Sequence, residues 1–487
     1  MRIFFLCLLL LLPNLCALAA PADDIWMSVL LDGRKIGHLH TTRTIRDGSV
    51  ITTQKMEIAL ERAGVTVALS SGETDAETPD GEPLAFASRT VISGIASMVN
   101  GVRRSDGRFD VVSEVGGAKQ ARVIGWPPGA LLAEGLRLSS SRDLSKPGTQ
   151  LRQLAFQIES LDAVEVDSTV GARERVDLPD GAHTLMRVNQ IVHMAGAPSR
   201  STSWVDADGT VYKMIMPLLG YELTTVACSQ ACALAPNQGT DILVHALARA
   251  PAAIAPADLR HGIVIDIAAR DGTPLQFAQT SEQRVRTTAQ GVELRIAPLD
   301  AGMPAGPEAA PIPADTQPDD WLQSDAPQIR KLAQEGVGSA KTPLEQMQNL
   351  QEFVRRFIRT KDLNVGYASA LEVAKNPEGD CTEHAVLLAA LGRALGIPTR
   401  VVDGLAYVGE YIGADHVFVP HAWMQAYIDG HWRSFDAALP GFDAGHIALF
   451  VGDGDPWQFF AGMDTLGRMR IERVTPLSAA ASGAGTP

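Results

Sequence analysis

Gly379-Asp380-Cys381-Thr382-Glu383-His384-Ala385 runs directly into an apolar stretch from Val386 to Leu395, which Gly396 and Pro398 follow. This pattern predicts a buried helix, because a glycine after the last leucine and a nearby proline are typical helix stops. Cys381 then lies in the first turn of that helix. The partial positive charge and unpaired N–H groups of a helix N-terminus favour a thiolate and can stabilise an oxyanion. The stretch therefore predicts a position suited to a reactive thiol.

A second stretch supplies a base and an acid. Residues 421–428 and 431–436 are two β-like runs joined by Asp429-Gly430, which is a strong signal for a two-residue hairpin. If Ile428 pairs with His431, the same register places Trp423 opposite Asp436.

Because side chains alternate between the faces of a strand, His421, Trp423 and Asp436 then point to one side. Asp436 becomes the diagonal neighbour of His421, roughly 7–8 Å away along the backbone and closer at the side chains. The hairpin thus predicts a His–Asp pair against which the helix with Cys381 could dock.

These short sequence motifs, in this order, resemble those of the transglutaminase-like superfamily in its bacterial form. The resemblance spans about residues 320–475, and the motifs that carry it are Gly379 to Ala385, Leu395 to Val402, His421-Ala422-Trp423 and Trp432 to Asp436. It implies a papain-like α+β core in which Cys381 is the nucleophile, His421 the base and Asp436 the acid that orients the imidazole.

The sequence departs from that family in its oxyanion donor. Eukaryotic members use a tryptophan upstream of the nucleophile, whereas no tryptophan lies between Trp321 and Trp423 here. Tyr367, Ser369 or Asn364 could substitute, together with the backbone N–H of Cys381. Trp423 would either shield the His–Asp pair from water or belong to the core.

Other titratable residues near these motifs have competing roles. His384 follows Cys381 by one helical turn, where its ring is poorly placed to take the thiol proton. His446 and Asp443 follow Asp436 closely and could line the cleft.

Composition limits the class of protein. The chain has 487 residues, 46% apolar and 20% charged, which is ordinary for a globular protein of two or three domains. Its net charge is −14 and no block of Lys or Arg is present, so a nucleic-acid partner is not expected.

The N-terminus predicts export. Met1-Arg2 precedes an apolar run from Ile3 to Leu12, and Ala17-Leu18-Ala19 supplies small residues for cleavage. Residues 1–19 are therefore interpreted as a signal peptide, and the mature protein is expected in the periplasm or outside the cell. No other apolar run reaches membrane length, so no membrane span is expected in the mature chain.

Cysteine usage agrees with export. After cleavage three cysteines remain, and Cys228 and Cys232 lie four residues apart, where an oxidising compartment favours a local disulfide. A metal site at these two is not favoured, since no His or third Cys lies nearby. Cys381 then stays outside the disulfide, as a nucleophile must.

The chain divides into five predicted regions. The predicted fold class is α+β, with a papain-like, transglutaminase-like C-terminal domain preceded by a large, mainly antiparallel β region that forms one curved sheet or a sandwich. Recurring Asp-Gly turns from Asp32-Gly33 to Asp208-Gly209 support that β assignment. The predicted limits are a signal peptide at 1–19, a β-rich domain at 20–226, a small β unit with Pro/Ala-rich linkers at 227–318, the catalytic domain at 319–475 and a disordered tail at 476–487.

Two functions are consistent with this sequence. The first is an exported thiol enzyme that acts on amide bonds of proteins or peptides, as a peptidase, an amidase or a transglutaminase-type acyltransferase. The second is a cell-envelope binding or scaffold protein with a vestigial transglutaminase-like domain. The expected partner is a protein or peptide substrate, which could be a cell-envelope component. No cofactor and no metal is expected, with calcium dependence left open.

Overall fold

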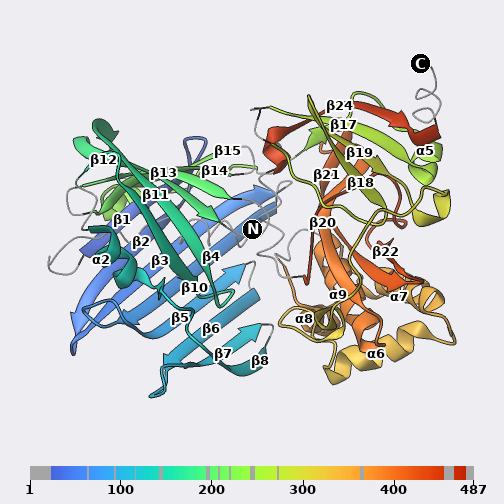
Figure 1. The fold of residues 1–487 in the computed structure, drawn as a ribbon, viewed down its shortest axis with the longest axis horizontal. Helices are drawn as coiled ribbons and strands as arrows, with labels where there is room; N and C mark the ends of the chain where they lie inside the picture. The colour runs from blue at the N-terminus through green and yellow to red at the C-terminus, as the bar shows by residue number, and fades with distance from the viewer. Residues whose placement is uncertain are drawn as a thin grey trace. The chain divides into compact units, whose positions relative to one another are not determined.

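A computed structural model describes most of the chain in two compact units, Met1–Ile242 and Leu243–Pro487, which are treated separately below (Figure 1). The described residues are 23–62, 65–92, 95–115, 117–141, 146–193, 198–206, 209–218, 221–241, 247–270, 272, 274–361, 367–454 and 465–478. The predicted signal peptide at 1–19 and most of the predicted tail at 476–487 lie outside them.

The described part of the first unit is organised around one 15-stranded sheet. Its strand order is β8-β7-β6-β5-β4-β3-β2-β1-β15-β14-β13-β12-β11-β10-β9, so two meanders join where β1 pairs with β15. All neighbouring strands are antiparallel except β9 and β10. The predicted large antiparallel N-terminal region is confirmed, and it is one sheet. The strands are β1 (Asp23–Leu31), β2 (Arg34–Arg46), β3 (Ser49–Arg62), β4 (Val65–Glu77), β5 (Pro83–Ile92), β6 (Ile95–Arg103), β7 (Phe109–Val115), β8 (Ala118–Ile124), β9 (Ala130–Leu131), β10 (Gln150–Gln157), β11 (Asp162–Leu178), β12 (Gly181–His193), β13 (Ser199–Val205), β14 (Val211–Leu218) and β15 (Tyr221–Ala227).

Asp-Gly turns connect several of these strands, as the sequence predicts. Asp32 and Gly33 have φ angles of 46° and 75° and join β1 to β2, with Leu31 opposite Arg34. Positive φ at both central residues matches the twist of the flanking strands, and Asp and Gly adopt it at little cost.

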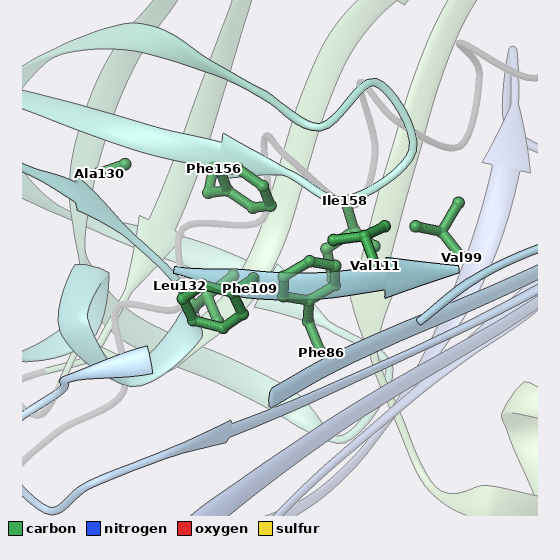
Figure 2. Packing of buried hydrophobic residues seen from close by; sticks show 8 residues of the cluster. All are labelled: Phe86, Val99, Phe109, Val111, Ala130, Leu132, Phe156 and Ile158. Carbon is green, nitrogen blue, oxygen red and sulfur yellow. The ribbon is translucent and has the colours of Figure 1, made fainter. Parts of the chain in front are cut away.

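An aromatic cluster packs the two meanders against each other (Figure 2). Phe86 on β5 contacts Phe109 on β7 and Phe156 on β10, with ring centroids 5.6 and 5.4 Å apart. Trp126 lies 4.2 Å from Phe156. A side chain at Gly101 would collide with the Phe86 ring, since a Cβ there would lie 2.1 Å from its Cζ atom. The sheet therefore closes onto its own core at this end.

A buried ion-pair cluster anchors helix α2 (Ala133–Ser141) beside the sheet. Glu134 is 1% exposed and accepts hydrogen bonds from Arg43 on β2, at 2.9 and 2.8 Å, and from Arg137 one turn along the helix. Burial alone would raise the pKa of Glu134, but the hydrogen bonds from Arg137 and Arg43 lower it overall. Glu77 on β4 accepts a hydrogen bond from the Gly135 amide at 2.9 Å, so its carboxyl group also caps the start of α2, while burial and next the charge of Asp75 raise its pKa to about 8.

Replacing Glu134 by glutamine should lower the free energy of unfolding by about 3 kcal/mol, because two buried guanidinium groups lose their counter-charge. Urea unfolding at neutral pH measures this. The matched control is Glu114→Gln, whose partner Lys119 is exposed, and it should cost less than about 1 kcal/mol. Equal losses in the two variants would contradict the anchoring role.

The same substitution has a pH signature. Because the pKa of Glu134 is lower in the folded state, its stabilisation is complete above the ordinary Glu value of about 4.3 and is lost as the pH falls below it. Glu134→Gln should therefore flatten that part of the stability–pH curve.

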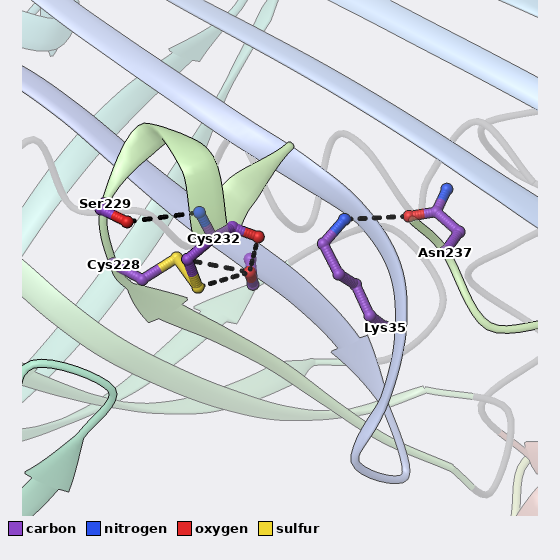
Figure 3. Close-up of a disulfide and its surroundings, with 6 residues drawn as sticks. Lys35, Cys228, Ser229, Cys232 and Asn237 are labelled. Atoms are coloured by element: carbon purple, nitrogen blue, oxygen red, sulfur yellow. Dashed lines mark hydrogen bonds between the residues drawn. A yellow bond between two sulfur atoms is a disulfide. The ribbon is translucent and has the colours of Figure 1, made fainter. Parts of the chain in front are cut away.

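The last strand of this sheet in the sequence, β15, leads into a disulfide between Cys228 and Cys232 (Figure 3). The short helix α3 (Gln230–Ala233) brings the two cysteines together, and Ser229 caps it by accepting a hydrogen bond from the Cys232 amide at 3.3 Å. The hydroxyl of Ser28 on β1 lies 3.4 Å from Cys228 Sγ. The bridge thus fastens the chain leaving β15 against β1.

Non-reducing peptide mapping of the purified protein should recover one bridged peptide that contains Cys228 and Cys232. Cys381 should be recovered with its thiol alkylated by a reagent added before digestion, because no disulfide includes it in the structure. A stable bridge between Cys381 and either of the other two would contradict this arrangement.

The second unit combines two sheets with a group of helices. In the five-stranded sheet β16, β21, β20 and β23 are neighbours in that order, and β22 pairs with β21; the four-stranded sheet has the order β18-β19-β17-β24. The strands are β16 (Ala248–Arg249), β17 (Ile263–Ala269), β18 (Gln283–Thr288), β19 (Gly291–Ile296), β20 (Thr399–Tyr411), β21 (Ala414–Ile428), β22 (His431–Phe435), β23 (His446–Gly452) and β24 (Met469–Pro476). The helices are α5 (Pro256–His261), α6 (Pro327–Val337), α7 (Pro343–Phe357), α8 (Ala370–Lys375) and α9 (Cys381–Ala394), with 3-10 turns at Leu299–Ala301 and Pro313–Thr316.

Helix α9 is the buried centre of this unit. Residues 382–393 are all buried, and α9 contacts α6, α7 and α8 as well as strands β20 and β21. The predicted buried helix after Cys381 is confirmed. The start of α7 is fixed by a capping box, which Thr342 and Glu345 form around Pro343.

The four-stranded sheet draws on distant parts of the chain. Strands β17 and β19, which lie within the small β unit predicted at 227–318, pair with each other, and β24 from the C-terminal end pairs with β17. Pro476, the first residue of the predicted tail, lies opposite Ile263 in that ladder. Within the described residues, no helix is long and apolar enough to span a membrane.

Candidate active site

The chain enters α9 through a tight turn that places Cys381 at the first helical residue. Asp380 is the N-cap and accepts a hydrogen bond from the Thr382 amide at 3.0 Å, while Glu383 accepts one from the Asp380 amide at 2.9 Å. Cys381 is half-buried, and the deeper residues of α9 are covered. Cys381 is therefore the first residue of a helix whose N–H groups and dipole favour negative charge on its sulfur.

The side chain of Glu383 stabilises this turn from its buried side. It is fully buried and also accepts a hydrogen bond from the Ala368 amide at 2.8 Å. Burial, and next the charge of Asp380, raise the pKa of Glu383 to about 8. Gly379 has φ of 140°, and a Cβ on it would lie 2.3 Å from Glu383 Cγ, so the site requires glycine. Sequence reasoning quoted Glu383 within the motif but assigned it no role.

The hairpin that carries the base and the acid has the predicted register. Ile428 pairs with His431 and Tyr427 with Trp432, and the ladder continues to Met424 opposite Phe435. Asp429 has φ of 52° and Gly430 of 84°, as this type of turn demands. Asp436 follows directly after the last residue of β22, so it leaves the ladder on the side where His421 lies.

His421 and Asp436 form a buried hydrogen-bonded pair. Nε2 of His421 lies 2.7 Å from Oδ2 of Asp436, and the two residues are 6% and 1% exposed. Oδ1 accepts backbone hydrogen bonds from Ala438 at 2.7 Å and Leu439 at 3.0 Å. Burial would raise the pKa of Asp436, but the charge and hydrogen bond of His421 and the hydrogen bond from His446 lower it far below the ordinary range. The carboxylate is thus ionised although it is buried.

This pairing determines the tautomer of His421. An ionised carboxylate only accepts hydrogen bonds, so Nε2 of His421 donates its proton to Asp436. In the neutral ring, Nδ1 then carries the lone pair and can take up a proton. Helix α7 supports the pair from outside, since the Asp436 amide donates to Gln351 Oε1 at 3.2 Å and Arg355 donates to the Asp436 carbonyl at 3.2 Å.

Helix α9 brings its first turn to the same region. It packs against β21, the strand that carries His421. The charge of Asp436 acts on His384, which follows Cys381 by one turn. His384 itself donates from Nδ1 to the Asp380 carbonyl at 2.6 Å, and burial lowers its pKa, so it is a neutral ring tied to the helix start.

Three of the four candidates for an oxyanion donor or a cleft residue lie among the described residues, in different surroundings. Tyr367 donates its hydroxyl proton to the Gly454 carbonyl at 2.7 Å, and Ser369 is buried as the N-cap of α8. Trp423 is 2% exposed, stacks beside His421 at a centroid distance of 6.2 Å and donates to Ser434 Oγ at 3.2 Å. Asn364 lies outside the described residues. The indole of Trp423 thus covers the His421 ring within the core.

A second histidine reaches the same carboxylate. Nε2 of His446 lies 3.0 Å from Asp436 Oδ2, so this oxygen has imidazoles of two strands as partners. The ligand atoms of His421, Asp436 and His446 all lie within 4.8 Å of one another, a grouping that could hold a metal ion. Hydrogen bonds to a shared carboxylate explain the grouping without a metal, and we assign it to them. The sequence predicted only that His446 could line the cleft. Its contact with Asp436 depends on the pairing of β23 with β20, and the sequence around His446 carries no signal for that pairing.

The arrangement has the parts of a thiol catalyst. A sulfur at a helix N-terminus, an imidazole with a basic Nδ1 and an ionised carboxylate behind it can together generate a thiolate–imidazolium pair. The N–H groups of the first turn of α9 can stabilise negative charge on a substrate oxygen.

Known proteins match this chain in part. The model of the transglutaminase-like superfamily matches residues 330–437. No curated protein matches the chain in sequence.

Three solved structures are distantly similar. A proposed cysteine protease from Cytophaga hutchinsonii is 17% identical, with a TM-score of 0.26 over 45% of this chain and 84% of its own. A β-barrel-like protein of the domain of unknown function DUF1849 from Brucella abortus is 12% identical, with a TM-score of 0.35 over 44% and 98%. A proposed protease from Parabacteroides distasonis is 12% identical, with a TM-score of 0.19 over 82% and 68%.

The matched residues contain the start of α9 with Cys381, strand β21 with His421, and Asp436. The predicted fold class is confirmed: a large antiparallel sheet precedes a mixed α/β region. Residues 330–437 of this chain form a domain of the transglutaminase-like superfamily.

Proposed function

We propose that the protein is an exported thiol enzyme that acts on amide bonds of proteins or peptides, with Cys381 as nucleophile, His421 as base and Asp436 as the orienting acid. The buried hydrogen bond of 2.7 Å between His421 and Asp436, in a unit whose central helix begins at Cys381, carries this proposal. The signal-like N-terminus and the Cys228–Cys232 disulfide support export to the periplasm or the cell exterior.

The first half of the reaction forms a thioester. Cys381 Sγ attacks the carbonyl carbon of the amide while its proton passes to His421 Nδ1. The carbonyl electron pair moves onto oxygen, where the N-terminus of α9 stabilises it. When the pair returns, the C–N bond breaks and His421 gives its proton to the leaving amine.

The second half releases the acyl group. Water, or an amine of a second substrate, loses a proton to His421 and attacks the thioester carbon, and the thiol of Cys381 is restored. Asp436 stays ionised throughout and stabilises the imidazolium that forms twice in the cycle. Whether water or an amine attacks separates a peptidase or amidase from a transglutaminase-type acyltransferase.

Replacement of Cys381 by alanine should abolish turnover and leave the fold nearly intact, because the side chain contributes a reactive sulfur and little packing. Peptide mixtures incubated with and without a labelled primary amine, and read by mass spectrometry, detect hydrolysis and acyl transfer together. Intact mass after brief iodoacetamide treatment near neutral pH should show one alkylated thiol in the native protein and none in Cys381→Ala.

Activity that survives Cys381→Ala would show that another residue is the nucleophile. A native thiol that alkylates no faster than an ordinary cysteine, together with no turnover, would favour the binding or scaffold function instead. The 15-stranded sheet of the first unit is the feature that would serve such a function.

Replacement of Asp436 by asparagine should reduce turnover by on the order of a hundredfold or more, because the neutral amide no longer stabilises the imidazolium. Alkylation of Cys381 at neutral pH should slow as well, since its ion-pair partner is weakened.

The matched control is Asp429→Asn, at the exposed turn of the same hairpin, where asparagine also tolerates positive φ. It should retain nearly full activity. Similar losses in the two variants, or an Asp436→Asn enzyme of native rate, would remove Asp436 from the triad.

A further inference from the structure

The carboxylate of Asp436 has four hydrogen-bond partners, and one of them has no part in the reaction described above. Oδ1 accepts from the amides of Ala438 and Leu439, and Oδ2 lies 2.7 Å from His421 Nε2 and 3.0 Å from His446 Nε2. All the acceptor positions of the carboxylate are therefore occupied. His446 takes the one position that the backbone and His421 leave.

The ring of His446 is held firmly in this place. It is 3% exposed at the first residue of β23, and it packs edge-on against Trp423 at 5.1 Å and beside Phe442 at 5.0 Å. Its Nδ1 lies 3.1 Å from the carbonyl oxygen and 3.2 Å from Oδ1 of Asp443, and the Asp443 amide, 3.3 Å away, points its N–H at the same nitrogen. Nε2 thus faces the carboxylate of Asp436, and Nδ1 faces two oxygens and the amide of Asp443.

The acidic partners of His446 favour its charged form. A ring that donates one proton to Asp436 and another to an oxygen of Asp443 is an imidazolium. The titratable groups that face it are Asp436 and Asp443, which favour the cation, and His421, whose ring centroid lies 5.6 Å away. Burial alone would lower the pKa of His446, but the hydrogen bonds and charges of Asp436 and Asp443 outweigh it and raise the pKa to about 9.

We propose that His446 is a positioning residue of the triad: it binds the same oxygen of Asp436 that His421 binds, holds the carboxylate in place and adds a positive charge beside the His421–Asp436 pair. This inference rests on the proposed function, and it assigns to His446 a role that the nucleophile, base and acid do not cover. The triad becomes a chain of Cys381, His421, Asp436 and His446.

The physical effect follows from the charges. An ionised Asp436 attracts the imidazolium that His421 forms in each half of the proposed reaction. A cation on the same carboxylate oxygen opposes that attraction, since like charges a few ångströms apart repel in a buried site. His446 thus acts on the reaction both by fixing the position of Asp436 and by its charge.

The test compares His446→Gln with the native protein. Glutamine keeps an N–H donor but carries no charge, so Asp436 loses a charged partner while the contact with Oδ2 can remain. NMR titration of isotope-labelled histidines in the full-length protein needs no substrate, and in it the native His446 should remain protonated at pH 7.5. The ring signals of His421 at fixed pH should differ between the two proteins. Where substrate turnover is measured, the maximal rate should fall and the alkaline limb of the rate–pH profile should move to higher pH, because a nearby cation disfavours a second positive charge at the site.

His431→Gln is the matched control, because His431 is an exposed histidine on the same hairpin. It should leave the His421 signals and the rate–pH profile unchanged. A folded His446→Gln protein whose His421 signals and rate–pH profile match those of the native protein, or a native His446 that is neutral at pH 7, would overturn the proposal.

A second variant covers the case in which His446→Gln does not fold. Asp443→Asn leaves His446 in place and removes only its outer acid, so the titration of His446 should move to lower pH. An unchanged His446 titration in that protein would contradict the assigned charge network. If the native protein shows no turnover that depends on Cys381, the proposed function is overturned. These histidine titrations can still be interpreted in that case, because they need no substrate.

Discussion

The hydrogen bond between His421 and Asp436 is the contact on which the rest of the candidate site depends. It exists because the two turn residues, Asp429 and Gly430, fix the register of β21 and β22, and because Asp436 follows the last paired residue. Backbone amides after Asp436 and two side chains of α7 then hold the acid from the remaining directions. A slip of one residue in the hairpin would turn the acid to the opposite face and separate the pair.

Local signals in the sequence were sufficient for much of this site. Asp429-Gly430 allows one tight register, and the glycine and proline after Leu395 end α9 where the structure ends it. The start of α7 is equally local, since its capping box lies within four residues. Such features depend on a few neighbouring residues, and sequence reasoning therefore placed the Cys helix and the His–Asp hairpin.

Long-range pairing was the part that sequence reasoning could not place. Nothing in β1 indicates that it pairs with β15 about two hundred residues later, and nothing in β24 indicates that it completes the sheet of β17 and β19. His446 belongs to the same class. It reaches Asp436 only because β23 pairs with the far side of β20, a choice made by packing over the whole unit. The role of Glu383 was missed for another reason. A glutamate inside this motif is interpreted as a residue of the helix start until the backbone amides that it binds are known.

The two units solve one electrostatic problem with different outcomes. Glu134 in the first unit and Asp436 in the second are both buried carboxylates shared between two basic side chains. The partners of Glu134 are guanidinium groups, which keep their protons at any pH the protein meets, so that cluster can only hold α2 in place. The partners of Asp436 are imidazoles, and an imidazole can exist with or without its charge near neutral pH. His446 lies between Asp436 and Asp443, and these two acids favour its charged form. Under the proposed function, the choice of imidazole over guanidinium therefore gives the second cluster groups that can exchange protons with a substrate, which the first cluster lacks.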